Sequence, residues 1–293
     1  APHAPPRGCS APWGTDLIDP TRPSTTTTKD QDHERPPTTM PHEPFILTAR
    51  IHAGMNAEVV LGGLLALSGF TSTLATGLLR KLFPDAPAEA ALNLTPTDVN
   101  GIGGWRATFD LPKEHHARTP ADIERFYAAS TLSPDARRIA ARIWSEVSRA
   151  EAAVHGMDLS EVHFHEIGRR ANIYAVGMIA ELFVKARVER FVVSPIPLAD
   201  NEVECAHGTV PYPAPALAAM LPGVAVRPYG GTGEPVTPTG LAVLKGLGAE
   251  FAPWPRMTVE AQARAYARAV FEGTANGTLF CWGTALPPVE DEA

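Results

Sequence analysis

Apolar residues are distributed in two different ways on either side of residue 44. Residues 1–44 contain ten of the 29 prolines and the run Ser24-Thr25-Thr26-Thr27-Thr28, with almost no periodic apolar positions. Such a composition buries too little apolar surface to fold, which predicts a disordered tail over 1–44. From Phe45 onward the apolar positions become periodic, and we expect one folded domain over 45–284 and a short flexible tail over 285–293.

The periodic part alternates between strand-like and helix-like segments. Alternation with period two, or a short apolar run, predicts strands at 45–51, 105–110, 161–165 and 190–194. Apolar positions three and four residues apart predict helices at 58–67, 71–82, 120–129, 134–155, 171–185, 213–221 and 238–247. Ser133-Pro134 is typical of a helix start, because serine caps free N–H groups and proline fits the first turn. The mixture predicts an α/β (or α+β) fold, a layered sheet with flanking helices.

Composition and charge narrow the classes of protein. With 44% hydrophobic and 19% charged residues the chain can form a packed core, and its net charge of −7 argues against a nucleic-acid partner. We find neither an apolar run of about 18 residues nor a signal-peptide pattern, so we expect no membrane partner. The three cysteines, Cys9, Cys205 and Cys281, suit neither a disulfide framework nor a paired metal knuckle, and we expect a cytoplasmic protein.

The densest chemistry lies in the segment His163-Phe164-His165-Glu166. In a strand, residues two apart share a face, so His163 and His165 would point the same way while Glu166 turns to the other face or into the loop. Two imidazoles on one face can share a divalent metal such as nickel, zinc or copper. The alternative is that both histidines only form hydrogen bonds with backbone and buried acids.

A second candidate group is Cys205-Ala206-His207, which precedes the proline-rich segment 211–215. Prolines fix the backbone, so Cys205 and His207 could both point at one ligand. The alternative is a buried thiol that lies next to a loop histidine and has no ligand.

A glycine-rich loop over 230–240 runs into the last predicted helix. Free N–H groups around Gly231, Thr232 and Gly233, and at the helix start with Thr237 and Thr239, could accept an anion such as a phosphate. No Gly-Lys-Ser/Thr follows, so this is not a Walker loop. Thr237 could equally be a helix cap followed by Pro238 at the first helical position.

Taken in order, these motifs resemble the signature of the LarC family of nickel insertion proteins. The matching stretches are HFHEIG at 163–168, SPIP at 194–197, AHG at 206–208, PYPAP at 211–215 and VTPTG at 236–240. The resemblance covers residues 45–284. It implies a cytoplasmic protein that inserts nickel into a pyridinium-type mononucleotide, the pincer cofactor of lactate racemase, in a reaction coupled to CTP hydrolysis.

The same resemblance assigns expected roles. Nickel would be handled by His163, His165, Cys205 and His207, with Glu58 and Glu166 as catalytic carboxylates. The loop residues Gly231, Thr232, Gly233, Thr237 and Thr239 would bind the mononucleotide. Mg or Mn with CTP would act through a partner domain, such as a separate C-terminal nucleotide-binding chain, and an oligomer is compatible with this.

The chain departs from the family pattern at several acidic positions. Arg50 stands in the first strand where family members carry an acid, and Ala171-Asn172 and Ala175 replace an Asp-Ser pair and a further Asp. Glu58 could substitute for a missing aspartate. An alternative function is therefore a non-catalytic relative that acts as a metal-binding or nucleotide-binding scaffold or carrier.

Overall fold

A seven-stranded mixed sheet forms the centre of the protein. The computed structural model describes residues 44–114, 117–164, 167–205 and 208–287. The strand order is β2 (Ala91–Val99), β3 (Ile102–Asp110), β10 (Met257–Ala265), β11 (Gly277–Ala285), β1 (Phe45–Ala53), β4 (Arg190–Val193) and β9 (Glu250–Phe251). Two small sheets pair β5 (Ile196–Leu198) with β8 (Val226–Pro228), and β6 (Glu202–Cys205) with β7 (Gly208–Pro211).

Strand β1 lies in the middle of this sheet. It runs antiparallel to β11, with Ala49 opposite Phe280, and parallel to β4, with Ala49 opposite Val193. These three residues are fully buried. Thr48, Arg50 and His52 alternate with the apolar residues Leu47, Ala49, Ile51 and Ala53, so β1 has the period-two pattern of a strand.

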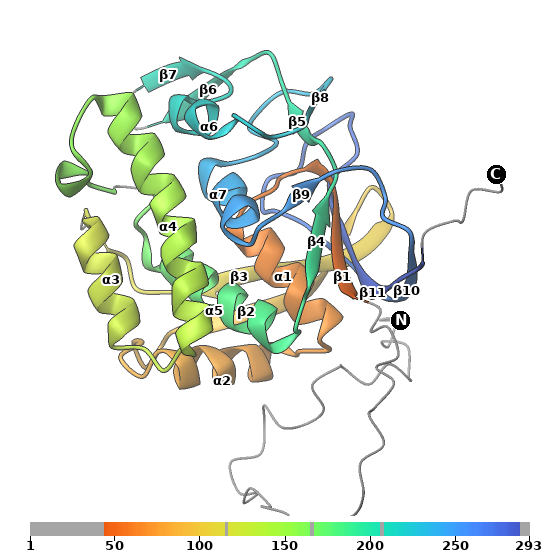
Figure 1. Ribbon diagram of the computed structural model, residues 1–293, viewed down its shortest axis with the longest axis horizontal. Helices are drawn as coiled ribbons and strands as arrows, with labels where there is room; N and C mark the ends of the chain where they lie inside the picture. The colour runs from red at the N-terminus through yellow and green to blue at the C-terminus, as the bar shows by residue number, and fades with distance from the viewer. Residues whose placement is uncertain (1–43, 115–116, 165–166, 206–207, 288–293) are drawn as a thin grey trace, which may run out of the picture.

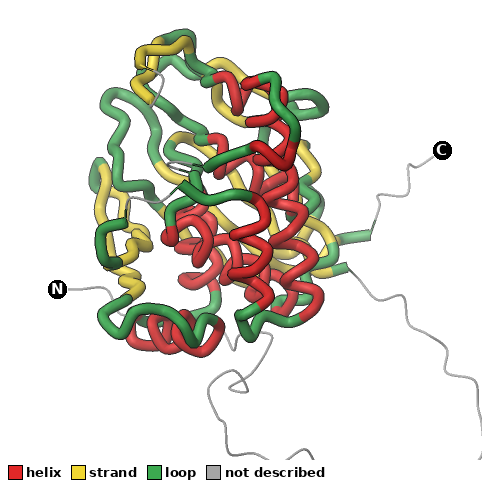
Figure 2. The backbone as a smooth tube through the Cα atoms, turned by 90° about the vertical axis from the view of Figure 1, so that its left-hand side faces the viewer, coloured by secondary structure: helices red, strands yellow, loops and turns green. Residues whose placement is uncertain are grey.

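The helices cover one side of the sheet in two layers. They are α1 (Ala57–Leu67), α2 (Ser72–Leu82), α3 (Pro120–Ala128), α4 (Pro134–His155), α5 (Arg170–Lys185), α6 (Pro215–Met220) and α7 (Pro238–Gly246), with a 3₁₀ turn, η2, at Leu159–Glu161. Helix α1 packs on β3, β10, β11 and α5, while α4 packs on α5, α6 and α7. Figure 1 shows α4 as the outer helix, with α1, α5 and α7 between it and the sheet, and Figure 2, viewed from that side, shows helices in front of strands.

Helix α1 lies very close to the sheet because of a glycine. A Cβ atom added to Gly63 would lie 2.3 Å from Cδ2 of Phe280, far inside van der Waals contact. The absence of a side chain at Gly63 therefore lets the α1 backbone pack directly on the aromatic ring of Phe280 in β11. The start of α1 is thereby fixed relative to the central strands.

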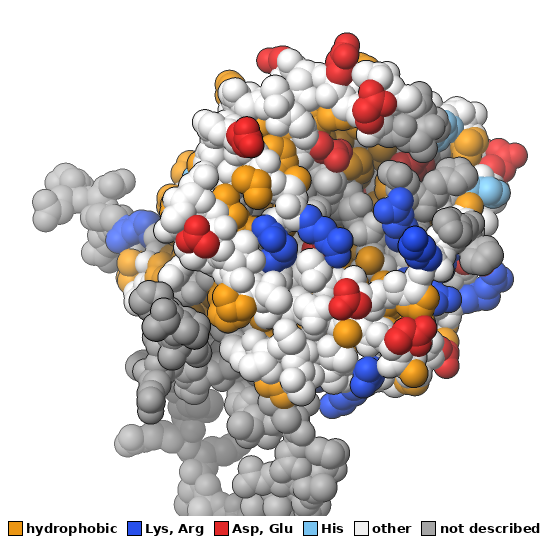
Figure 3. Space-filling view, turned by 180° about the vertical axis from the view of Figure 1, so that it is seen from behind, with side chains coloured by type: hydrophobic (Ala, Val, Ile, Leu, Met, Phe, Trp, Pro, Cys, Tyr) orange, Lys and Arg blue, Asp and Glu red, His pale blue; other side chains and the backbone are white. Residues whose placement is uncertain are grey.

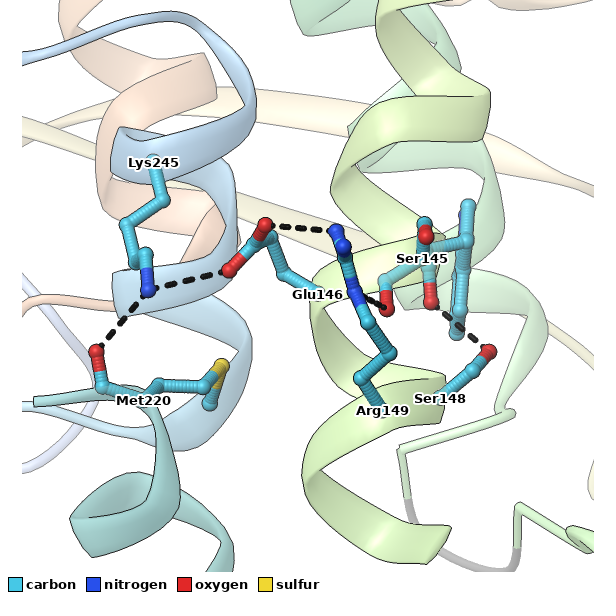
Figure 4. A network of polar contacts seen from close by, with 7 residues as sticks. Ser145, Glu146, Ser148, Arg149, Met220 and Lys245 are labelled. Atoms are coloured by element: carbon cyan, nitrogen blue, oxygen red, sulfur yellow. Dashed lines mark hydrogen bonds and ion pairs between the residues drawn. The ribbon is translucent and has the colours of Figure 1, made fainter. Parts of the chain in front are cut away.

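A polar network joins α4, α6 and α7 (Figure 4). The Glu146 carboxylate accepts from Lys245 Nζ at 3.0 Å and from Arg149 at 2.8 Å, and Lys245 also donates to the Met220 carbonyl at 3.0 Å. The Lys245 ammonium group thus links its own helix, α7, to α4 and α6. Exposed ion pairs contribute only about 0–1 kcal/mol, so apolar packing supplies most of the stability and the network fixes orientation.

The structure confirms the fold class and most predicted elements, with one clear correction. The described part of the predicted strand 161–165, residues 161–164, does not form a regular strand: η2 ends at Glu161, and Phe164 makes an isolated bridge with Arg118. Among the described residues, Arg118 alone pairs with the backbone of this segment, so no ladder of hydrogen bonds extends along it. Of the tail predicted at 1–44 only Pro44 is described, and of the tail predicted at 285–293 only residues 285–287 are described, with Ala285 ending β11. Both tails stay predictions.

Candidate functional site

A large cavity of 1320 Å³ opens beside the starts of α1 and α7. Its walls also include the loop after β3, the end of α4, the segment around His163 and the β6–β7 hairpin. Four of the candidate residues, Glu58, His163, Thr237 and Thr239, line it. Residues far apart in the sequence therefore meet at one place, which makes this cavity the candidate site.

His163 faces the cavity because its neighbours face the core. Val162 and Phe164 are each 1% exposed, whereas His163 is exposed and belongs to the cavity wall. The ring of Phe164 packs on Trp144 of α4 at 5.4 Å between centroids. Alternation over three residues thus orients the imidazole even though no regular strand forms.

Hydrogen bonds from the loop around Arg118 hold the segment around His163 in place. The backbones of Arg118 and Phe164 exchange two hydrogen bonds of 3.1 and 2.7 Å. The Arg118 guanidinium donates to the Gly168 carbonyl at 2.6 Å and to Glu114 at 2.5 Å, and Glu114 also accepts from the Arg170 backbone N–H at 2.6 Å. Burial opposes ionisation of Glu114, but these donors outweigh it and lower its pKa.

Glu58 stands in the first turn of α1. Asn56 caps this helix by accepting from the Val59 N–H at 2.9 Å, and both Asn56 and Glu58 line the cavity. Burial raises the pKa of Glu58, and Arg268, whose Nε lies 3.9 Å away, offsets part of that rise. A carboxyl group with a raised pKa beside a cavity is suited to proton transfer or metal binding.

The start of α7 forms another part of the wall. Thr237 caps this helix, since its hydroxyl accepts from the Gly240 N–H at 3.1 Å, and Pro238 follows at the first helical position. Thr239 is buried beneath it. Gly231, Thr232 and Gly233 are not among the residues that line this cavity.

The remaining candidates are only partly described. His165, Glu166 and His207 lie outside the described residues. Cys205 ends β6 and pairs through its backbone with Gly208 of β7. Val203 and Val210 of the same hairpin line the cavity. The hairpin that carries Cys205 is therefore part of the site.

The cavity carries more acidic than basic side chains. Among the described lining residues there are six glutamates, and the three cations are Lys113, Arg169 and Arg268. The glutamates are Glu58, Glu114, Glu151, Glu161, Glu204 and Glu234. His155 lies 3.4 Å from Glu151. Within the described ranges, no group of three or more His, Cys, Asp or Glu residues is arranged to hold a metal ion.

Some of these glutamates could not be recognised from the sequence. Glu114 and Glu161 belong to no spaced motif, and only the fold brings them to the cavity. At the surface, Figure 3 shows Lys and Arg side chains in a band across the middle of the face seen from behind, with acidic side chains above it.

One further property concerns membranes. In the part of the chain that the structure describes, no single helix is long and apolar enough to span a membrane. The helices α1 and α2 together reach the length and apolar composition of a span, but the pair is bent by 115°.

Comparisons with known proteins agree with the motif order. The sequence model of a family described as nickel insertion protein matches residues 47–286. A putative nickel insertion protein from Geobacter metallireducens is 34% identical over 214 residues, which cover 73% of this chain and 54% of that protein. A pyridinium-3,5-bisthiocarboxylic acid mononucleotide nickel insertion protein from Acetivibrio thermocellus is 34% identical over 216 residues, covering 71% and 53%.

A third relative extends the comparison. A pyridinium-3,5-bisthiocarboxylic acid mononucleotide nickel insertion protein from Nocardioides sp. is 31% identical over 208 residues, which cover 71% of this chain and 52% of that protein. The chain thus spans about half the length of these curated relatives. No solved structure matches it. By the match of the family model over most of its length, this chain belongs to the nickel insertion protein family, the LarC family that its motifs resemble.

Proposed function

We propose that this protein takes part in inserting nickel into a pyridinium-type mononucleotide, the step that matures the nickel-pincer cofactor of lactate racemase type enzymes. Family membership and the printed names of two relatives support the reaction class. The observation that carries the proposal for this chain is the cavity itself, where His163 and Glu58 meet the capped starts of α1 and α7.

Nickel would enter this cavity as a substrate. Imidazole is a good ligand for nickel, and a wall with an excess of carboxylates attracts a dication. We assign nickel handling to His163 together with His165, Cys205 and His207, and proton transfer or ligand exchange to Glu58 and Glu166. The position of the β6–β7 hairpin in the cavity wall supports the inclusion of Cys205.

The mononucleotide would occupy the rest of the cavity. Small-molecule pockets measure about 300–1,000 Å³, so a volume of 1320 Å³ leaves room for both the nucleotide and a metal ion. We assign its phosphate to the start of α7 at Thr237 and Thr239, because N–H groups at a helix start favour anions. Gly231, Thr232 and Gly233 do not line this cavity, and a contact between them and the phosphate stays a prediction of the family resemblance.

The energy supply and the assembly belong to the same proposal. Mg or Mn with CTP would act through a partner domain or a separate chain that supplies the nucleotide site, and the complete system would work in the cytoplasm. An oligomer is compatible with this arrangement. These assignments rest on the family resemblance, since the matched region is about half of each relative.

Nickel binding by the full chain tests the proposal. We expect micromolar affinity in calorimetry, weakened at least tenfold in His163→Ala and to a smaller degree in Glu58→Gln. Glu124→Gln is the matched control, since Glu124 is exposed on α3 and does not line the cavity. Equal affinity of the His163→Ala variant and the unchanged protein would refute the assignment.

A turnover assay separates insertion from simple carriage. The full chain would be mixed with the metal-free mononucleotide, nickel, CTP and Mg, and with the C-terminal half of a relative. Nickel-loaded product that exceeds the protein concentration supports insertion. Product that stops at one equivalent indicates the carrier or scaffold alternative.

A further inference from the structure

A second cavity, of 540 Å³, lies on the other face of strand β1. Arg50 and His52 alternate with Ile51, and the register places Arg50 beside Leu279 of β11 and Leu279 beside Arg264 of β10. Ala49 and Phe280, one residue away, face α1. Successive residues point to opposite faces of a sheet, so this cavity is separated from α1 by the sheet itself. Its lining residues are Arg50, Ile51, His52, Ser194, Arg227, Tyr229, Gly230, Pro253, Trp254, Thr274, Ala275 and Leu279.

Two guanidinium groups of this cavity have only neutral partners. Arg50, which is 7% exposed, donates to the Thr48 hydroxyl at 2.9 Å and to the carbonyls of Ala252 at 3.1 Å and Val192 at 3.0 Å. Within the described ranges no carboxylate forms an ion pair with Arg50. A buried cation without a counter-charge is unfavourable, and burial lowers the pKa of Arg50 to about 10.

Arg227 of β8 repeats this pattern beside β1. Its guanidinium donates to the carbonyls of Ile51 at 3.1 Å, His52 at 3.2 Å and Pro228 at 3.3 Å. Because arginine carries five donors, its Nε–H and one further N–H have no acceptor among the described residues. The described residues again provide no ion pair for Arg227. The cavity thus holds two positive charges, and none of its described lining residues is a carboxylate.

Other lining groups suit an organic molecule. Trp254 is 53% exposed and its ring lies over the Arg50 guanidinium, 4.9 Å from Cζ to the centroid. Tyr229 and Leu279 add apolar surface. The Ser194 hydroxyl accepts from the Ile51 N–H at 2.9 Å, so its own proton can be donated to a ligand.

His52 adds no third permanent charge. Burial, followed by the nearby Arg264 and Arg227, lowers the pKa of its imidazole, so His52 is neutral at pH 7. A neutral imidazole donates one hydrogen bond and accepts another. The positive field therefore comes from fixed guanidinium groups, whose charge does not change across the physiological pH range.

We propose that this second cavity binds a small organic anion, with a phosphate or carboxylate group held by Arg50 and Arg227 and an apolar or aromatic body against Trp254, Tyr229 and Leu279. Guanidinium groups are the usual partners of both oxyanions. The volume of 540 Å³ lies within the range of about 300–1,000 Å³ that is common for small-ligand pockets. This site is independent of the nickel proposal, because no residue is shared between the linings of the two cavities.

Titration of the full chain with inorganic phosphate and, separately, with benzoate tests the proposal. Tryptophan fluorescence and calorimetry would follow binding, since Trp254 lies directly over Arg50. We expect millimolar or better dissociation constants for at least one probe, about −4 kcal/mol or more of binding free energy. Tighter binding of phosphate identifies a phosphate ester as the ligand, and tighter binding of benzoate identifies an aromatic carboxylate.

Variants separate this cavity from the rest of the surface. Arg227→Met should weaken binding about tenfold or more, the loss expected for charge-assisted hydrogen bonds. Arg142→Met, an exposed change on α4, and His163→Ala, in the large cavity, should leave anion affinity unchanged. Arg50→Met is a second test, which requires a circular dichroism spectrum to verify folding. The proposal is overturned if neither probe binds below about 10 mM, or if Arg227→Met binds as the unchanged protein does.

Discussion

Replacing Gly240 with alanine should destabilise this protein, although the same change in a helix usually does the opposite. Alanine is favoured over glycine inside helices by about 0.5–1 kcal/mol. At Gly240, however, the new Cβ would lie 2.5 Å from the Met55 carbonyl oxygen and 3.0 Å from Asn56 Cα. Both obstacles are backbone atoms at the start of α1 and cannot rotate away.

The two effects can be compared in size. Overpacking of this kind costs about 1–3 kcal/mol, and a shift of Met55 also endangers the 3.0 Å hydrogen bond from the Thr237 N–H, worth about 1 kcal/mol. After subtraction of the helix preference, we expect a net loss of about 1–3 kcal/mol. Because this contact joins the starts of α1 and α7, nickel affinity should fall as well.

Urea unfolding followed by circular dichroism measures the change. Gly77→Ala is the matched control, since Gly77 lies on the exposed side of α2 and an added Cβ meets nothing within 4 Å. That variant should gain about 0.5–1 kcal/mol. If Gly240→Ala were stabilised to the same degree as Gly77→Ala, the close packing of α7 on α1 would be wrong.

Three further changes test other parts of the structure. Tyr127→Phe removes a hydroxyl that donates to the Ile173 carbonyl and accepts from Trp144, both at 2.8 Å, and two buried groups without partners should cost about 2–4 kcal/mol in urea unfolding. Asp122, in the capping box of α3, has its pKa lowered from 3.8 to about 2. Its ionised form therefore stabilises the fold above pH 3.8, and this contribution is lost as the pH falls through about 2. In Asp122→Asn, the free energy of unfolding should depend less on pH in this acid range. Burial raises the pKa of Glu58, so ionisation of this carboxyl lowers the free energy of unfolding as the pH rises through the folded-state pKa. Glu58→Gln should therefore become more stable relative to the unchanged protein as the pH rises from acid to neutral. If the stability difference between the two proteins were the same at all these pH values, Glu58 would not be in a buried environment.

Local chemistry made most helices predictable. Ser133 accepts from the Ala136 N–H at 3.3 Å, as its position before Pro134 indicated, and the predicted range of α4 is the observed one. Strand β2 was not predicted, because Pro96 interrupts its pattern. The proline is tolerated there because β2 lies at the edge of the sheet and pairs only with β3.

Long-range arrangement was harder to infer for the site. The sequence identified His163 and Thr237 as candidates, and the fold places both at one cavity. It could not identify Glu114 or Arg268, because single charged residues without a motif are usually solvated. The pairing of Arg118 with Phe164, which replaces the predicted strand, depends on a loop whose position no local pattern encodes.

The position of β1 between β4 and β11 has a consequence for how the protein is made. Of the strands that the structure describes, the ribosome delivers β1 first and β11 last, yet the two are hydrogen-bonded along most of their lengths. During synthesis, one edge of β1 therefore stays without its partner until residue 285 has left the exit tunnel. Open edges and long-range pairing slow folding and favour aggregation. We expect the nascent chain to need chaperone protection for most of its synthesis, and truncations that remove β11 to yield insoluble protein.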